Sequence, residues 1–205
     1  MNDAVQSSRS ELKQSRRQAI LEALAVQLEQ HPGERITTAK LAASLGVSEA
    51  ALYRHFPSKA RMFEGLIEFA EDTVFGLIRK IVDEDDNALS RCEKIMALLM
   101  GFSAKNPGIS SILVGVALTG ETERLRQRVS QFFDRLETQF RQILRERELT
   151  LTEAGGRPVN ETASLLVAVL EGHIQQFVRS GYRQSPLQGW DAKWQLISGM
   201  LRSYA

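Results

Sequence analysis

Residues 37–56 constrain the fold of this chain more than any other stretch. Small and apolar side chains recur there at the spacing of one helix face and lead to Gly46. A glycine is favoured at that point because a helix end commonly needs a residue with positive φ. Ser48 is a good N-cap for a second helix, and Pro57 ends that helix because the residue before a proline avoids the α region. Two short helices joined by a glycine turn predict a helix-turn-helix.

The outward face of the second helix carries side chains suited to a DNA groove. Small alanines allow a helix to enter the major groove, where thymine methyl groups offer van der Waals contacts. Hydroxyl, imidazole and cationic groups beside them can donate to phosphate oxygens and fix the register. The candidate DNA contacts on this helix and its flanks are Ser48, Glu49, Ala50, Ala51, Tyr53, Arg54, His55 and Lys59.

Two further groups of residues are candidates for the walls of the same groove. Thr37, Thr38 and Lys40 lie at the predicted N-terminus of the first short helix, and such an end favours phosphate. Arg16 and Arg17 lie on the early turns of a preceding helix. They are interpreted either as phosphate contacts or as a solvated helix end.

Composition and charge agree with a globular protein that meets a polyanion at one end. The 205 residues are 43% hydrophobic and 25% charged, with a net charge of +1. Through Phe63 there are nine Lys and Arg against six acids, a net of +3, whereas the remainder carries −2. The single cysteine, Cys92, is interpreted as a small core residue, and it excludes an intramolecular disulfide or a Cys-based zinc cluster. No membrane span and no secretory signal are recognised, so we expect a cytoplasmic protein.

The helical periodicity predicts an all-α chain of three parts. Residues 1–10 are expected to form a disordered arm, 11–57 the DNA-binding domain, and 58–205 a helical regulatory and dimerisation domain that starts with a long connecting helix. The last two predicted helices are apolar on more than one face, which is typical of helices that pair with a second subunit. The candidate dimer contacts are Leu166, Leu170, Phe177, Trp190, Trp194, Ile197 and Leu201. A two-fold dimer places its recognition helices about 34 Å apart and reads a palindrome.

The pattern L-A-x-x-L-G-V-S-x-x-x-L-Y-x-H-F-x-x-K resembles the DNA-binding domain of the TetR family of regulators, over roughly residues 14–63. The blocks RITTAKLAAS, SEAALYRHFPSK, RMF, LIEF, NPG and FVRS resemble the nucleoid occlusion factors of that family. Those factors bind chromosomal sites and restrain the tubulin-like division protein FtsZ over DNA. The resemblance implies a TetR-like fold and a nucleoid-associated protein that acts with one or several dimers per DNA site.

The resemblance also implies an FtsZ-binding face between the fourth and fifth helices. The residues it assigns to this face are Phe69, Leu98, Gly101, Lys105 and Asn106. A positive Lys105 beside a groove floored by Gly101 suits a short extended segment of a largely acidic partner. The chain departs from the family with Lys105 where an arginine is common. For Phe69, packing under a neighbouring helix is the alternative to partner contact.

Three functions are weighed for the chain. The first is a DNA-binding factor that acts on FtsZ, with DNA either fixing the angle between head and body or gathering dimers. The second is a repressor that a small molecule releases from its operator, and the third is an enzyme. The sequence contains no Gly-rich phosphate loop, nucleophile elbow or H-E-x-x-H, so catalysis, a cofactor and a catalytic metal are not expected. The acidic run 83–86 is interpreted as a solvated loop rather than a metal site.

Overall fold

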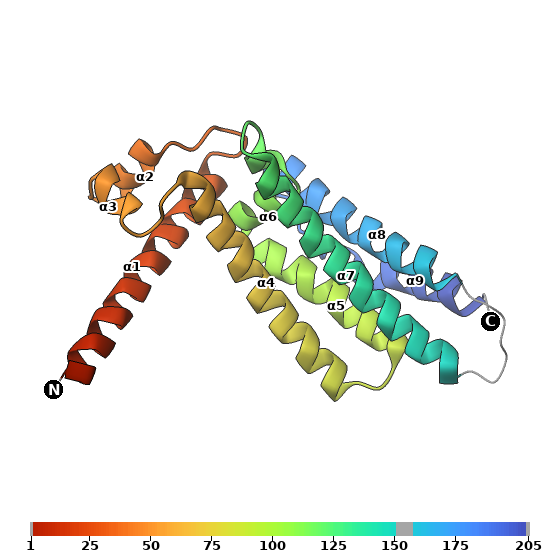
Figure 1. The fold of residues 1–205 in the computed structure, drawn as a ribbon. Helices are drawn as coiled ribbons and strands as arrows, with labels where there is room; N and C mark the ends of the chain where they lie inside the picture. Colours follow the sequence, from red (N-terminus) through yellow and green to blue (C-terminus); the bar gives the residue numbers. More distant parts are fainter. Residues whose placement is uncertain (1, 151–157, 204–205) are drawn as a thin grey trace.

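The computed structural model describes residues 2–150 and 158–203, and all regular structure within them is helical, which confirms the all-α prediction. Figure 1 shows a small head of three helices at one end of a body whose long helices run alongside one another. The elements are α1 (Asn2–Gln30), α2 (Thr38–Ser44), α3 (Glu49–Tyr53), α4 (Lys59–Glu84), α5 (Ala88–Lys105), α6 (Pro107–Leu113), the short 3-10 helix η1 (Val116–Leu118), α7 (Glu123–Thr150), α8 (Val159–Arg179) and α9 (Trp190–Ser203).

The head consists of α1, α2 and α3, and its turn chemistry follows the sequence. Gly46 has a φ of +64°, as the predicted helix end requires. The Ser48 side chain accepts a hydrogen bond from the Ala51 amide at 3.3 Å, which confirms the predicted N-cap of α3. Leu52 and Phe56 are buried and attach this helix to the core.

Helix α1 begins earlier than the sequence analysis predicts. Residues 1–10 were expected to be disordered, but the helix is continuous from Asn2. The prediction rested on the polar composition of this segment, and polarity does not prevent a helix. The first helix-breaking residues of the chain are Pro32 and Gly33, so no local signal stops α1 before its observed end. In Figure 1, α1 projects away from the body.

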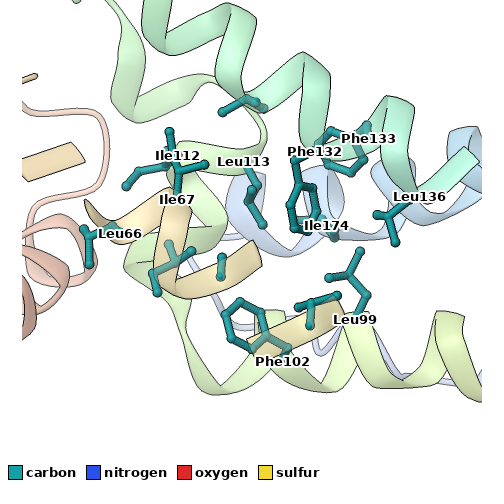
Figure 2. Packing of buried hydrophobic residues seen from close by; sticks show 14 of the residues in the cluster. Leu66, Ile67, Leu99, Phe102, Ile112, Leu113, Phe132, Phe133, Leu136 and Ile174 are labelled. Carbon is teal, nitrogen blue, oxygen red and sulfur yellow. The ribbon is translucent and has the colours of Figure 1, made fainter. Parts of the chain in front are cut away.

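The body is built around one apolar core to which α4, α5, α6, α7 and α8 contribute. Figure 2 shows side chains of these helices converging, among them Ile67, Leu99, Phe132 and Ile174. All four are fully buried, and the Phe132 ring lies edge-on to Phe75 at a centroid distance of 5.5 Å. Cys92 is also fully buried, which confirms its interpretation as a core residue.

The head is joined to the body by a close contact between α1 and α6. Gly108 packs on α1 so tightly that an added Cβ would lie 2.1 Å from the Ala25 carbonyl oxygen. A second tie comes from the end of α8, where the Tyr182 hydroxyl donates to the Leu28 carbonyl at 3.4 Å. The angle of α1 is therefore set by the body as well as by the other head helices.

On α8 and α9, most of the side chains predicted to contact a second subunit are buried within their own chain. Five of the candidate dimer contacts pack within their own chain: Leu166, Leu170, Phe177, Trp190 and Trp194 are 0–6% exposed. Ile197 and Leu201 are half-buried. The large apolar side chains that these two helices expose are instead Leu165, Leu196 and Met200, at 47%, 74% and 48% exposure. Both helices are apolar on two sides, and the sequence pattern cannot tell which side the chain covers itself.

Within residues 2–150 and 158–203, no helix combines the length and apolar character that crossing a bilayer requires.

Candidate nucleic-acid interface and partner face

Three of the predicted DNA contacts form one hydrogen-bonded chain across α2 and α3. The Thr38 hydroxyl donates to the Glu49 carboxylate at 2.5 Å, and the Tyr53 hydroxyl donates to Thr38 at 3.3 Å. Tyr53 and Glu49 are exposed, and Thr38 is half-buried. These two hydrogen bonds fix α2 and α3 relative to each other and leave their outer face open to solvent.

The hydroxyls that cap α2 and α3 keep a donor available. Thr37 accepts from the Lys40 amide at 3.3 Å, as Ser48 does from the Ala51 amide. In both cases the oxygen is the acceptor, so the hydroxyl hydrogen can still donate to a phosphate oxygen. Lys40 is exposed, within 3.8 Å of Glu34.

The remaining positions on α3 present a small and basic surface. Ala50 and Arg54 are exposed and Ala51 is half-buried. An alanine at the outer face lets the helix backbone approach base edges closely, and Arg54 adds a positive charge beside it. This is the geometry that the helix-turn-helix prediction requires.

Arg17 has a structural contact that the sequence analysis did not anticipate. Its guanidinium donates to the His55 carbonyl at 2.6 Å and lies 4.2 Å from the centroid of the Phe56 ring. Arg17 therefore braces α1 against the end of α3, whereas Arg16 is exposed. His55 is half-buried, and its Nδ1 is buried without a hydrogen-bond partner among the described residues, so this nitrogen does not face a phosphate.

Lys59 at the start of α4 is paired within the protein. Its ammonium forms an ion pair with Glu121, which lies in the connection between η1 and α7. The two side chains are only 21% and 13% exposed. This contact could not be predicted from the sequence because the partners are 62 residues apart.

The predicted partner face lies along α4 and α5. Phe69 packs against α5 and is also partly exposed: its ring centroid lies 6.4 Å from that of Phe102, and 39% of the residue remains exposed. Leu98 and Gly101 are half-buried, and Lys105 is exposed in the last turn of α5. Leu98, Gly101 and Lys105 follow one another at spacings of three and four residues, which places them on one side of α5.

Asn106 and Leu187 have contacts at the predicted partner face that the sequence did not indicate. The Asn106 side chain donates to the Phe102 carbonyl at 2.8 Å, so it ends α5 as well as lying beside Lys105. Leu187, in the connection from α8 to α9, is 38% exposed and would lie 3.9 Å from a Cβ on Gly101. The Pro186 carbonyl oxygen before it lies 2.8 Å from Nδ1 of His173. Leu187 thus forms a rim of this surface that sequence patterns alone do not reveal.

The acidic run 83–86 is organised by hydrogen bonds to Asp85. Its carboxylate accepts from the Ser90 hydroxyl at 2.5 Å, the Lys94 ammonium at 2.6 Å and the Asn87 amide at 2.8 Å. The hydrogen bonds from Lys94, Ser90 and Asn87 hold the pKa of Asp85 well below its usual range. Among the described residues, no group of three or more His, Cys, Asp or Glu side chains could hold a metal ion.

A hollow of about 580 Å³ lies between the segment 113–118, α7 and α8. Its lining is mixed, with four charged side chains beside six apolar ones: Arg126, Asp134, Glu137 and Glu171, and Leu113, Val114, Leu118, Val129, Phe133 and Val167. Burial raises the pKa of Glu171. Small-molecule sites are usually lined by apolar side chains with a few placed polar groups, and this hollow is more evenly mixed.

Two family models match the chain. Residues 20–66 match the model described as "Bacterial regulatory proteins, tetR family". Residues 86–202 match the model described as "Tetracyclin repressor-like, C-terminal domain".

Relatives and solved structures agree with these matches. The chain is 54% identical over 191 residues to the nucleoid occlusion factor SlmA of Shewanella amazonensis, covering 92% of this chain and 96% of the relative. It is 53% identical over 196 residues to the SlmA of Idiomarina loihiensis, covering 95% and 99%. Among solved structures, the TetR-family regulator PfmR of Thermus thermophilus superposes with a TM-score of 0.69 at 23% identity, covering 87% of this chain and 96% of that chain. The fatty acid degradation regulator FadR of Bacillus halodurans superposes with a TM-score of 0.73 at 13% identity, covering 87% and 95%, and shows the shared fold.

Proposed function

The chain belongs to the TetR family, within the group of SlmA nucleoid occlusion factors, and from this premise we propose that it is a nucleoid occlusion factor that binds specific chromosomal sites as a dimer and there antagonises FtsZ assembly. The observation that carries the proposal is the identity of 53–54% over more than nine-tenths of the chain to two proteins of that name. The protein binds and does not catalyse. Its site of action is the nucleoid.

The head supports DNA binding through the outer face of α2 and α3. Thr38, Glu49 and Tyr53 are held in one hydrogen-bonded chain, and the exposed Ala50 and Arg54 lie beside it. In the proposed complex α3 enters the major groove, while the hydroxyls and cations around it contact phosphates.

The exposed side of α8 and α9 supports pairing with a second copy. Leu165, Leu196 and Met200 lie exposed there. Gly172 and Gly199 are on the same helices, and an added Cβ at either would meet nothing within 4 Å. Large apolar side chains beside open glycine positions suit the close approach of helices from a second subunit. Two heads in one dimer then read the two halves of a palindrome.

The surface formed by Phe69, Leu98, Gly101, Lys105 and Leu187 supports contact with FtsZ. Phe69 and Leu187 offer exposed apolar area. Gly101 leaves room for an extended backbone, and Lys105 supplies a positive charge at one end. We assign to it a short extended segment of FtsZ that carries an apolar side chain and acidic groups.

The structure offers a route between the two surfaces. Helix α4 is continuous from Lys59 to Glu84, so it begins at the DNA side and carries Phe69 in its middle. Only a few residues separate Lys105 from Gly108, which packs against α1 of the head. DNA that fixes the head therefore acts on the partner face through both α4 and the α5–α6 junction.

The test is FtsZ polymer assembly followed by sedimentation, with and without DNA selected for binding to this protein. We expect antagonism that requires the DNA and that Lys105→Glu removes, because the substitution reverses the charge beside the groove. Arg145→Glu is the matched control, since it reverses a positive charge in the same way at an exposed position on α7. Its antagonism should equal that of the wild type.

Two results would contradict the proposal in different ways. Equal loss of FtsZ antagonism in Lys105→Glu and Arg145→Glu would contradict the assignment of this partner face. Specific DNA binding without any effect on FtsZ would favour the ligand-released repressor, and a thermal-shift screen of small molecules would then identify the ligand.

A further inference from the structure

The Lys59 ammonium already has an anionic partner within the protein, although the position of Lys59 at the start of α4 predicts a contact with DNA phosphate. The Glu121 carboxylate binds it, and both side chains are largely buried. Glu121 comes from the body, from the turn that precedes α7. A carboxylate and a phosphate oxygen are chemically similar acceptors for an ammonium group.

The Lys59–Glu121 pair, at the turn before α7, lies next to two ion pairs between α4 and α7. Arg124 of α7 binds Glu64 of α4 at 2.9 Å, and Arg128 binds Glu71 at 2.5 Å. Glu64 and Glu71 are 14% and 13% exposed. In these two pairs the anion is on α4 and the cation on α7, whereas the Lys59–Glu121 pair has the opposite polarity.

We infer that Glu121 competes with DNA phosphate for Lys59, so that the body lowers the DNA affinity of the head and DNA binding opens this contact. The inference rests on the proposed DNA binding. It makes Glu121, a residue outside the DNA-binding domain, a determinant of affinity.

The competition follows from charge. If Lys59 leaves Glu121 for a phosphate, binding must first break an ion pair that is shielded from solvent. If the ammonium stays between the two, the carboxylate and the phosphate are brought close together and repel each other. Either way a neutral side chain at position 121 favours the bound state.

The decisive variant is Glu121→Gln, which keeps the size of the side chain and removes its charge. We expect about a fivefold to tenfold gain in affinity for the selected DNA at fixed salt, the range of a partly buried ion pair. Glu123→Gln is the matched control, because it removes the same charge at a position two residues away. The Glu123 side chain is 66% exposed and paired with Arg126. This substitution should change the affinity by less than about twofold.

A double-mutant cycle separates the specific competition from a general charge effect. In a Lys59→Gln background, Glu121→Gln should no longer raise the affinity. A gain that persists without Lys59, or that Glu123→Gln reproduces, would overturn the inference. So would an unchanged affinity in Glu121→Gln.

Failure of the inference and of the proposed function are distinguishable in the same titration. A wild-type protein that shows no preference for any DNA sequence contradicts the proposed function. A wild-type protein that binds its site as tightly as Glu121→Gln contradicts the inference alone. Hydrogen exchange gives an independent readout on the wild type: amides of residues 119–122 should exchange faster when DNA is bound, and slower or unchanged exchange contradicts the opening.

Discussion

At the scale of single residues, Gly108 shows how a short sequence block acquires a physical meaning. The block NPG marks a resemblance in the sequence, but nothing in the sequence says why it ends in glycine. In the structure the Gly108 backbone touches the Ala25 carbonyl of α1, and any side chain there would collide with it. A backbone atom cannot move aside as the end of a side chain can, so the contact has a strict size limit.

Gly108→Ala should therefore lower the free energy of unfolding by about 2–3 kcal/mol, as overpacking in a well-packed contact does. Thermal unfolding of the purified protein measures this. Gly76→Ala is the control, because its Cβ would meet only the end of Arg79 at 3.9 Å. Within α4 that change should stabilise by about 0.5–1 kcal/mol. Equal stability of the two variants would show that α1 and α6 separate without cost.

Residue-level prediction from the sequence succeeded where the deciding contacts are local. Gly46 and Ser48 were identified because a helix end and an N-cap depend on neighbours within three residues. The Lys59–Glu121 pair and the position of Leu187 over Gly101 could not be predicted, since each joins residues that are distant in sequence. A charged residue at the surface has many possible partners, and only the packed helices select one.

At the scale of elements, α2 and α3 act as one unit because the Tyr53 and Thr38 hydroxyls and the Glu49 carboxylate connect them. Their outer face combines neutral donors with charges. These two kinds of group affect DNA binding differently: a cation on a phosphate releases counterions, whereas a neutral hydroxyl does not.

Tyr53→Phe and Arg54→Gln separate the two contributions. Tyr53→Phe removes one hydroxyl and should weaken DNA binding about fivefold, near 1 kcal/mol, with the same dependence on salt. Arg54→Gln should also weaken binding, and it should reduce the slope of log K against log salt by about one. Fluorescence anisotropy at several salt concentrations measures both quantities. A reduced slope in Tyr53→Phe, or an unchanged slope in Arg54→Gln, would reassign these side chains.

The elements themselves were largely predictable, and their orientation was less so. Periodicity indicated each long helix because one apolar stripe repeats along it. For α8 the stripe is broad, and both Leu165 and Leu166 satisfy it. The structure covers Leu166 and leaves Leu165 47% exposed, a choice that depends on how α5 and α7 pack around the helix. The start of α1 was missed for a different reason, since polar helices lack a stripe.

At the scale of the whole molecule, the proposed dimer depends on the exposed apolar side of α8 and α9. Leu196 is 74% exposed and Met200 is 48% exposed on one helix. Such area is costly in water and is typical of a surface that a second subunit covers. In the proposed complex each head reads one half of a palindrome, so loss of the dimer would also remove the pairing of two heads on one DNA.

Leu196→Arg should convert the dimer to a monomer, because the charge would be buried between the subunits without a partner. Sedimentation velocity measures the mass, and DNA titration should show at least a tenfold loss of affinity for the palindrome. Gln131→Arg introduces the same charge at an exposed position on α7 and should remain dimeric. A wild-type protein that sediments as a monomer at micromolar concentration would contradict the pairing.

Cys92 has a consequence for the study of this molecule by spectroscopy. It is the one cysteine of the sequence, and its side chain is fully buried in the body. A thiol-reactive dye or spin label therefore cannot reach it while the body stays folded. A cysteine introduced at an exposed site on the head can be labelled selectively in the otherwise natural chain. The distance between the two heads of a dimer then becomes measurable, with and without DNA, and the slow labelling of Cys92 reports unfolding of the body in the same sample.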